Sequence, residues 1–154
     1  AEQALALIPK KHFIFRADAS AWWTVAMQRT GQVEQALSIL DNKLKKLNPL
    51  GEPGQQIRFM IHAMFVHLTN ANIPPIEKYN KSFFDIPFIS PYMLAWGLYF
   101  KAIFCWWNNN PAGVVKNFTQ LLEYRYHARP RLVIEAYICL SLALQELNRS
   151  DEAK

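Results

Sequence analysis

Histidine and cysteine are the residues of this chain whose side chains are best suited to metal binding, and their spacing argues against it. His62 and His67 are five positions apart, so on a helix they point to different sides and cannot share a metal as residues four apart can. Cys105 and Cys139 lie within apolar stretches, without metal-ligand spacing or a redox-pair motif. We therefore expect no metal site, and we predict buried free thiols in a reducing compartment.

Carboxylates and nucleophiles form no arrangement typical of catalysis. Glu34, Asp151 and Glu152 stand where helices are expected to begin, and a negative charge at that position is explained by the helix dipole. No paired carboxylates lie in an apolar setting, no serine or cysteine lies in a nucleophile motif, and the phosphate-binding pattern G-x-x-x-x-G-K-[ST] does not occur. The sequence therefore predicts no catalytic residues, no cofactor in this fragment and a protein that is not an enzyme.

Polar and aromatic residues offer a candidate binding surface instead. Aligning the expected helix pairs by the residues that break them places four residues at equivalent positions, and Lys101 comes about one and a half turns before one of them. Such arrays bind ligands on an inner surface lined by first helices, so the five residues form a candidate strip for a ligand or partner. The strip comprises Gln28, His67, Lys101, Trp107 and Gln145. Gln28 and Gln145 could equally be plain solvated residues.

Large aromatic residues elsewhere are better explained by packing between helix pairs than by an effector pocket. Adjacent residues on a helix differ by about 100° in direction, so both members of a tryptophan pair are not expected to face the same core. We expect one of Trp106 and Trp107 to face the concave surface. The other aromatic residues considered are Trp22, Trp23, Trp96, Tyr92, Tyr99 and Phe100.

The stretch Ala21 to Leu47 has the pattern of two helices folded back on each other. Gly31 interrupts it, because glycine accepts the left-handed backbone needed just past a helix end. Apolar residues in the second half recur at helical spacing on one face, and Ala36 is small where the helices would cross. That face comprises Val33, Ala36, Leu37, Leu40, Leu44 and Leu47.

The same unit recurs along the chain. Glu2 to Leu5 repeats as Glu34 to Leu37, and Asp151 to Ala153 resembles a third copy; Ala36 and Ala153 are 117 residues apart, or three periods of 39. A period of this length is typical of helical-hairpin arrays, in which neighbouring pairs bury each other's apolar faces. The expected breaks are Gly31, Asn70 to Pro75, Asn108 to Pro111 and Asn148.

We therefore predict an all-α protein, a right-handed superhelix of about three to four antiparallel helix pairs of tetratricopeptide-like type. A single domain is expected over 1–154, with pairs at about 13–47, 55–86, 90–127 and an incomplete 131–154. Ala1 to Ile8 resembles the tail of a second helix, and Ser150 is placed to begin a new one. Both ends are thus expected to be cut within a repeat, so we expect a fragment of a longer array whose exposed ends self-associate.

Charge and hydropathy exclude several other classes. The net charge is +5, and its basic clusters (Lys43 to Lys46 and Arg125 to Arg131) are better explained as solvated helix faces or ends than as a nucleic-acid footprint. Tyr92 to Trp107 is apolar, but its 16 residues fall short of the roughly 20 that a membrane span needs. With no signal peptide, we expect a cytoplasmic protein without direct nucleic-acid or membrane contact.

Two further passages are distinctive. They are Trp107-Asn108 with Pro111-Ala112, Phe118 and Glu123 to Tyr126, and Glu135 to Tyr137 with Leu142 to Arg149 and Glu152-Ala153. Together with Gly31 and Glu34 to Leu37, they resemble the tetratricopeptide-like region of MalT-like, LuxR-type bacterial transcription regulators. Thr24 and Lys43 stand where the general tetratricopeptide pattern has a small residue and a late alanine, and the period is longer than about 34.

This resemblance implies a sensor that binds a small-molecule inducer or a regulatory protein and relays the signal to a DNA-binding domain outside the fragment. In that family a nucleotide-binding switch domain precedes the array and a helix-turn-helix domain follows it. The alternative is a tetratricopeptide adaptor that mediates protein–protein interaction with no role in transcription. The full-length reading frame would separate the two, since only the regulator needs the flanking domains.

Overall fold

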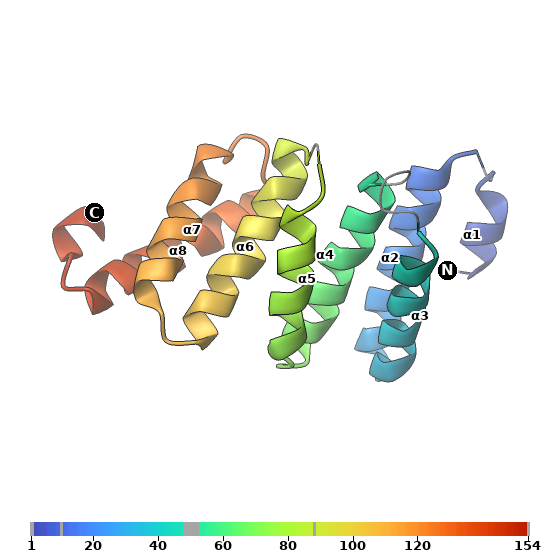
Figure 1. Ribbon diagram of the computed structural model, residues 1–154, viewed down its shortest axis with the longest axis horizontal. Coiled ribbons are helices and arrows are strands. Elements are labelled where there is room, and N and C mark those ends of the chain that lie inside the picture. Colours follow the sequence, from blue (N-terminus) through green and yellow to red (C-terminus); the bar gives the residue numbers. More distant parts are fainter. Residues whose placement is uncertain (1, 10, 48–52, 88, 154) are drawn as a thin grey trace. The chain divides into compact units, whose positions relative to one another are not determined.

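The computed structural model describes residues 2–9, 11–47, 53–87 and 89–153. All regular structure in these ranges is helical (Figure 1), so the all-α prediction is confirmed. The chain divides into two compact units, Ala1–Pro87 and Phe88–Lys154. No helix in the described ranges is both long and apolar enough to cross a membrane.

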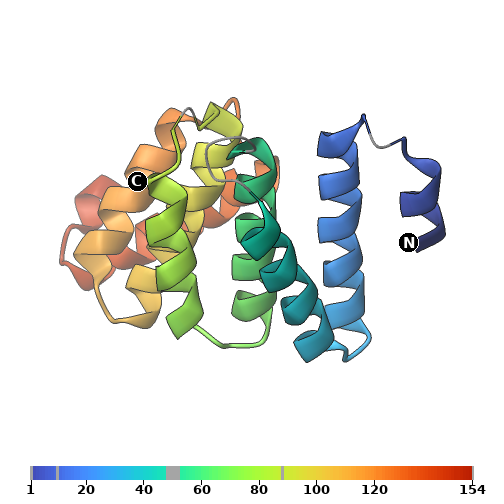
Figure 2. The same ribbon diagram turned by 45° about the vertical axis from the view of Figure 1, so that its right-hand side comes forward.

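Unit 1 consists of a short N-terminal helix followed by two antiparallel helix pairs. Its helices are α1 (Glu2–Leu7), α2 (Phe13–Arg29), α3 (Val33–Lys46), α4 (Pro53–Thr69) and α5 (Pro74–Phe84). Helix α2 packs against both α3 and α4, α3 packs against α4, and α4 pairs with α5. Figure 2 shows α1 beside α2. Arg16 fixes it there, since Nη1 donates to the carbonyl oxygens of Leu5 (2.7 Å) and Ile8 (2.5 Å).

The core of unit 1 forms where α2, α3 and α4 meet. The apolar face predicted for α3 is confirmed, because Ala36 and Leu40 are fully buried and the other four members are partly buried against the same core. Small residues on α2 let the helix axes approach closely. The buried residues around Leu40 are Ala17 and Ala21 of α2 and Phe59, Ala63 and Val66 of α4.

Unit 2 consists of α6 (Pro91–Trp107), α7 (Pro111–Glu123), α8 (Pro130–Glu146) and the single 3₁₀ turn η1 (Ser150–Ala153). Ser90 and Asn110 cap α6 and α7: their side-chain oxygens accept from the N–H groups of Met93 (3.4 Å) and Gly113 (2.9 Å). Each cap is followed by a proline in the first turn, where its fixed φ suits a helix and its missing N–H is not needed.

Helix α7 buries one side completely. It packs between α6 and α8, and Val114, Phe118 and Leu121 are fully buried. Val115 and Leu122 are only partly buried. The helix ends at Glu123, so Tyr126 lies outside it and is 84% exposed.

Four turns with the same backbone geometry end α2, α4, α6 and α8 within the described residues. At each, a left-handed residue donates its N–H to the carbonyl three positions back, and the next residue donates to the carbonyl five positions back, with N···O distances of 2.8 to 3.1 Å. This is the Schellman arrangement, which satisfies the last carbonyls of a helix and reverses the chain. The left-handed residues are Gly31, Ala71, Asn109 and Asn148, with φ of 83°, 54°, 51° and 58°.

Candidate binding grooves

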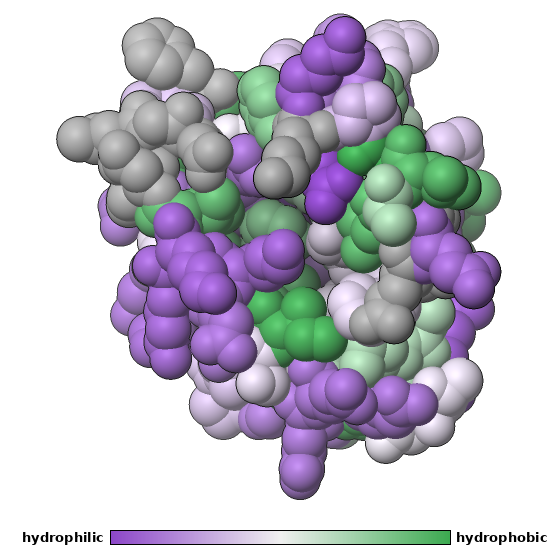
Figure 3. Space-filling view, turned by 90° about the vertical axis from the view of Figure 1, so that its right-hand side faces the viewer, coloured by the Kyte–Doolittle hydropathy of each residue, from purple (hydrophilic) through white to green (hydrophobic). Residues whose placement is uncertain are grey.

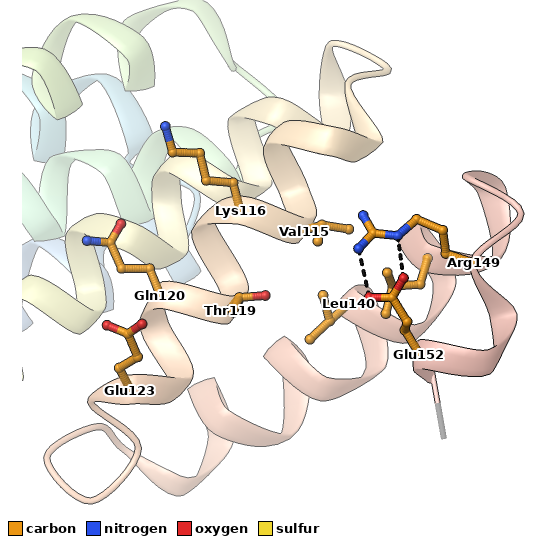
Figure 4. A pocket seen from close by; sticks show the side chains of 9 residues that line it. Val115, Lys116, Thr119, Gln120, Glu123, Leu140, Arg149 and Glu152 are labelled. Atoms are coloured by element: carbon orange, nitrogen blue, oxygen red, sulfur yellow. Dashed lines mark hydrogen bonds and ion pairs between the residues drawn. The ribbon is translucent and has the colours of Figure 1, made fainter.

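A groove in unit 2 lies between α7 and η1, with α8 as its floor. It has a volume of about 690 Å³. Leu140 and Leu144 give it an apolar base, and polar residues of α7 and η1 form its rim (Figure 4). Its lining comprises Val115, Lys116, Thr119, Gln120, Glu123, Leu140, Leu144, Arg149 and Glu152.

Charges of both signs stand on that rim. Arg149 Nε and Nη2 each donate to a carboxylate oxygen of Glu152 at 2.7 Å (Figure 4), a two-point contact within one turn. This bonding holds the pKa of Glu152 below its usual value and raises the pKa of Arg149. Lys116 and Glu123 lie on α7 seven residues apart, so they share one face of the helix. The groove therefore suits a ligand with an apolar body and polar or zwitterionic groups.

A groove of about 570 Å³ occupies the matching place in unit 1. Trp23 and Met27 of α2 form its floor, eight and four residues before the left-handed Gly31, just as Leu140 and Leu144 precede Asn148. Gln32 and Gln35 match Arg149 and Glu152 in the same way. The lining is Gln3, Trp23, Ala26, Met27, Thr30, Gln32 and Gln35.

A third copy of this position is filled by a second helix. His67 precedes the left-handed Ala71 by four residues, as Met27 precedes Gly31, and it is buried at 7% exposure, like Met27 at 6% and Leu144 at 4%. Its ring lies 5.8 Å from the ring of Tyr79 on α5, and its Nδ1 lies 3.3 Å from Asn72 Nδ2. The Tyr79 hydroxyl donates to Asp41 on α3.

Burial sets the protonation of this cluster. Desolvation lowers the pKa of His67, and the negative charge of Asp41 opposes that shift without cancelling it. Desolvation also raises the pKa of Tyr79, and the hydrogen bond to Asp41 adds to the shift. A neutral imidazole beside a protonated phenol is the stable state near neutral pH, so the side chains of His67 and Tyr79 both carry no charge there.

The five strip residues predicted from the sequence are divided between the two units. Gln28 and His67 belong to unit 1, whereas Lys101, Trp107 and Gln145 belong to unit 2. His67 is buried in the cluster above, Gln28 is half-buried, and the three residues of unit 2 are exposed. The burial of His67 leaves it no surface to offer an external ligand.

The register of the strip also differs from the one expected. Gln28 and Gln145 come three residues before their left-handed residues, and the matching positions are Leu68 and Trp106. His67 and Trp107 each lie one position away from those. Lys101 and Trp107 are six residues apart, so they point about 120° apart on α6. The five residues therefore do not share one position of the repeat.

Sequence reasoning missed the polar rim of the unit 2 groove. The sequence does place polar residues at helical spacing on one face of α7, opposite the buried Phe118. These residues are Lys116, Thr119, Gln120 and Glu123. Spacing along one helix does not reveal which elements flank that face, so a groove between α7 and η1 could not be predicted from it.

The cysteines are free and partly buried. Burial raises the pKa of the Cys105 thiol, with smaller opposing effects from Lys101 and from a contact with Asn117. Burial and the charge of Glu135 raise the pKa of Cys139. Both thiols are thereby held in the protonated form, which is a poor nucleophile.

The described residues offer no metal site, and no known protein matches the chain. Among residues 2–9, 11–47, 53–87 and 89–153, no group of three or more His, Cys, Asp or Glu side chains is placed to hold a metal ion. No protein-family model, curated protein or solved structure matches the chain.

Proposed function

We propose that this chain is a non-catalytic binding array of tetratricopeptide-like helix pairs stacked as a right-handed superhelix. One observation carries this proposal: the four identical turns recur at separations of 40, 38 and 39 residues. A backbone turn repeated at nearly constant spacing is expected of duplicated helix pairs, each of which buries its apolar face on the next.

The packing inside each unit supports the array. In unit 1 the second helix α3 contacts both first helices α2 and α4, and in unit 2 the second helix α7 contacts both α6 and α8. A first helix therefore packs on its own partner and on the following first helix, as stacked pairs require. Rows of such helices present long surfaces to a ligand or a protein.

We further propose that the array is the effector- or protein-binding sensor region of a LuxR-type, MalT-like transcription regulator. The support is the sequence resemblance together with the unit 2 groove, whose apolar floor and two-signed rim fit a metabolite that carries both kinds of group. Binding there would bridge α7, α8 and η1, and the relative pose of these elements would then bias a switch elsewhere in the regulator.

A metabolite screen tests the sensor proposal. Thermal unfolding of the chain is measured against sugars and other small metabolites, because a ligand that binds only the folded state raises the transition temperature. For each ligand found, calorimetric titration compares the chain with Gln120→Ala, at the groove, Trp107→Ala, at the predicted strip, and Tyr126→Ala, an exposed aromatic residue elsewhere. A ligand that binds in the groove is expected to lose about tenfold in affinity with Gln120→Ala, and a ligand that binds at the strip is expected to lose as much with Trp107→Ala. Either ligand is expected to keep its affinity with Tyr126→Ala.

The groove is an open surface feature, which also favours the adaptor function, since peptides and proteins occupy open grooves that would enclose little of a small ligand. A full-length reading frame with a phosphate-binding loop upstream and a helix-turn-helix downstream would support the regulator. A frame without them, together with a screen that finds no metabolite, would contradict the sensor and leave the adaptor.

A further inference from the structure

A small pocket in unit 2 lies between the turn that joins α6 to α7 and the last turn of α8. Its volume is about 80 Å³, far below the roughly 300–1,000 Å³ typical of pockets that take a whole small-molecule ligand. The pocket therefore suits a single functional group. It shares no residue with the groove of unit 2 and is lined by Trp106, Asn109, Asn110, Pro111, Val114 and Glu146.

The pocket combines a carboxylate with an indole ring. Glu146 is exposed and forms no ion pair with another residue that the structure describes. Arg149 is the nearest cation along the chain, but two of its nitrogens donate to Glu152, so it does not neutralise Glu146. Trp106 is 36% exposed, and the face of an indole attracts an organic cation. Both groups therefore favour a positively charged ligand.

Helix ends add negative potential to the pocket. The C-terminal ends of α6 and α8 lie here, and each such end carries about half a unit of negative charge from its carbonyl groups. Neither helix has a basic residue in its last turn, whereas α2, α3 and α5 do. The N-terminal end of α7 opposes this potential, but Asn110 already caps it through the N–H of Gly113 at 2.9 Å. The pocket thus lacks the cation that other helix ends of the chain supply.

The place of Glu146 in the repeat is exposed in other first helices as well. Counted from the left-handed turn residues, Glu146 matches Arg29 and Trp107, which are both exposed although α4 packs on α2 and α8 packs on α6. Unit 1 has Gln28 and Thr69 where unit 2 has the indole and the carboxylate of the pocket. The attraction for a cation is therefore a property of unit 2 and does not come from the repeat alone.

We infer that this pocket binds an alkylammonium group, presented either by a lysine of a partner protein or by a free amine. An ammonium is compact and has three N–H donors. One N–H donates to the carboxylate of Glu146 in a charge-assisted hydrogen bond, and a second donates to the side-chain oxygen of Asn109. The carbon atoms next to the nitrogen contact the indole of Trp106. The site is separate from the groove, so it does not depend on a metabolite being found there.

An NMR titration with three probes tests the site, followed at the backbone amide of Asn109. The peptide acetyl-Gly-Gly-Lys-Gly-Gly-amide is expected to bind with a Kd on the order of 1 mM. The same peptide acetylated at its lysine is expected not to bind, because acetylation removes the charge. The third probe, n-butylammonium, presents the group without a peptide. Equal affinity for this probe identifies a free amine as the source, and tighter binding of the peptide identifies a lysine of a protein.

Matched substitutions separate the pocket from a general attraction of cations to acidic or aromatic surface. Glu146→Gln is expected to weaken peptide binding about tenfold. Glu34→Gln, which removes the same charge from an exposed position of α3, is expected to leave it unchanged. Trp106→Leu is expected to weaken binding about threefold.

An exposed ring of unit 1 supplies the aromatic control. Figure 3 shows the side of unit 1 that carries α1, where apolar residues lie exposed among hydrophilic ones. Phe15 of this unit is 66% exposed, and Phe15→Leu is expected to leave peptide binding unchanged. Circular dichroism checks that each variant keeps its helix content. Unchanged affinity with Glu146→Gln, equal binding of the acetylated peptide, or no shift at Asn109 with any of the probes would overturn the inference.

Discussion

At the residue scale, the left-handed turn positions are where this backbone departs most from ordinary helix. Glycine adopts a positive φ without steric cost, whereas a residue with a Cβ atom pays roughly 1–2 kcal/mol for it. Of the four left-handed turn residues, one is glycine, Gly31. Ala71 holds φ of 54° and has no polar side chain that could form a local hydrogen bond to offset the steric cost. The turn that joins α4 to α5 is thus the strained one of the series.

Ala71→Gly is expected to stabilise the chain by about 1 kcal/mol, because it removes the Cβ from a left-handed position. Gly31→Ala is expected to destabilise it by a similar amount. A Cβ atom at Gly31 would meet nothing within 4 Å, so that cost is purely conformational. Urea unfolding monitored by circular dichroism measures both midpoints, and equal midpoints for the two variants would refute the strain argument.

The same positions explain where sequence reasoning succeeded and failed on the candidate site. Gly31 and Asn148 were identified as breaks, and Gln28 and Gln145 do occupy equivalent places. In the second pair the break was expected within Asn70 to Pro75, and the left-handed residue is Ala71, a residue type that seldom adopts that conformation. The strip took His67 as the equivalent of Gln28, whereas the residue three positions before Ala71 is Leu68.

At the element scale, helix boundaries were predictable and helix faces less so. Proline after Ser90 or Asn110 marks a helix start by backbone chemistry alone, and both starts were found. The face that α7 buries depends on where α6 and α8 lie, which local sequence does not encode. Val114 and Val115 are both valines in adjacent positions, and only packing decides that Val114 is the fully buried one.

The cluster around His67 links three helices of unit 1 and should make its stability depend on pH. Because burial lowers the pKa of His67 in the folded chain, the unfolded chain binds the proton first as pH falls through the ordinary value of 6.5. The unfolded state then holds more protons, so the free energy of unfolding decreases. Stability is fully present above pH 6.5, declines below it and levels off once pH has passed the lowered pKa.

His67→Leu is expected to remove this part of the pH dependence, since leucine occupies the matching position of α8 at Leu144. Urea midpoints measured at pH 7.5 and at a series of lower pH values compare the two chains. The unmodified chain should lose more stability over that range than the variant. Parallel curves for the two would show that the imidazole is not the group responsible.

At the scale of the whole molecule, the two units carry separate cores. Leu40 lies at the centre of unit 1, packed among residues of α2 and α4. Phe118 is fully buried in unit 2, where its ring neighbours Tyr99. In a repeat array most contacts are made between adjacent pairs, so stability is distributed along the chain and local opening can stay confined to one region.

Truncating each core in turn tests whether the units open independently. Leu40→Ala should cost about 2–5 kcal/mol and Phe118→Ala about 3–5 kcal/mol, because each leaves a cavity that the surrounding helices fill only in part. Amide hydrogen exchange followed by mass spectrometry is expected to accelerate in unit 1 for Leu40→Ala and in unit 2 for Phe118→Ala. Faster exchange in both units with either substitution would mean that the two cores unfold as one cooperative body, in which case ordering one groove would order the other as well.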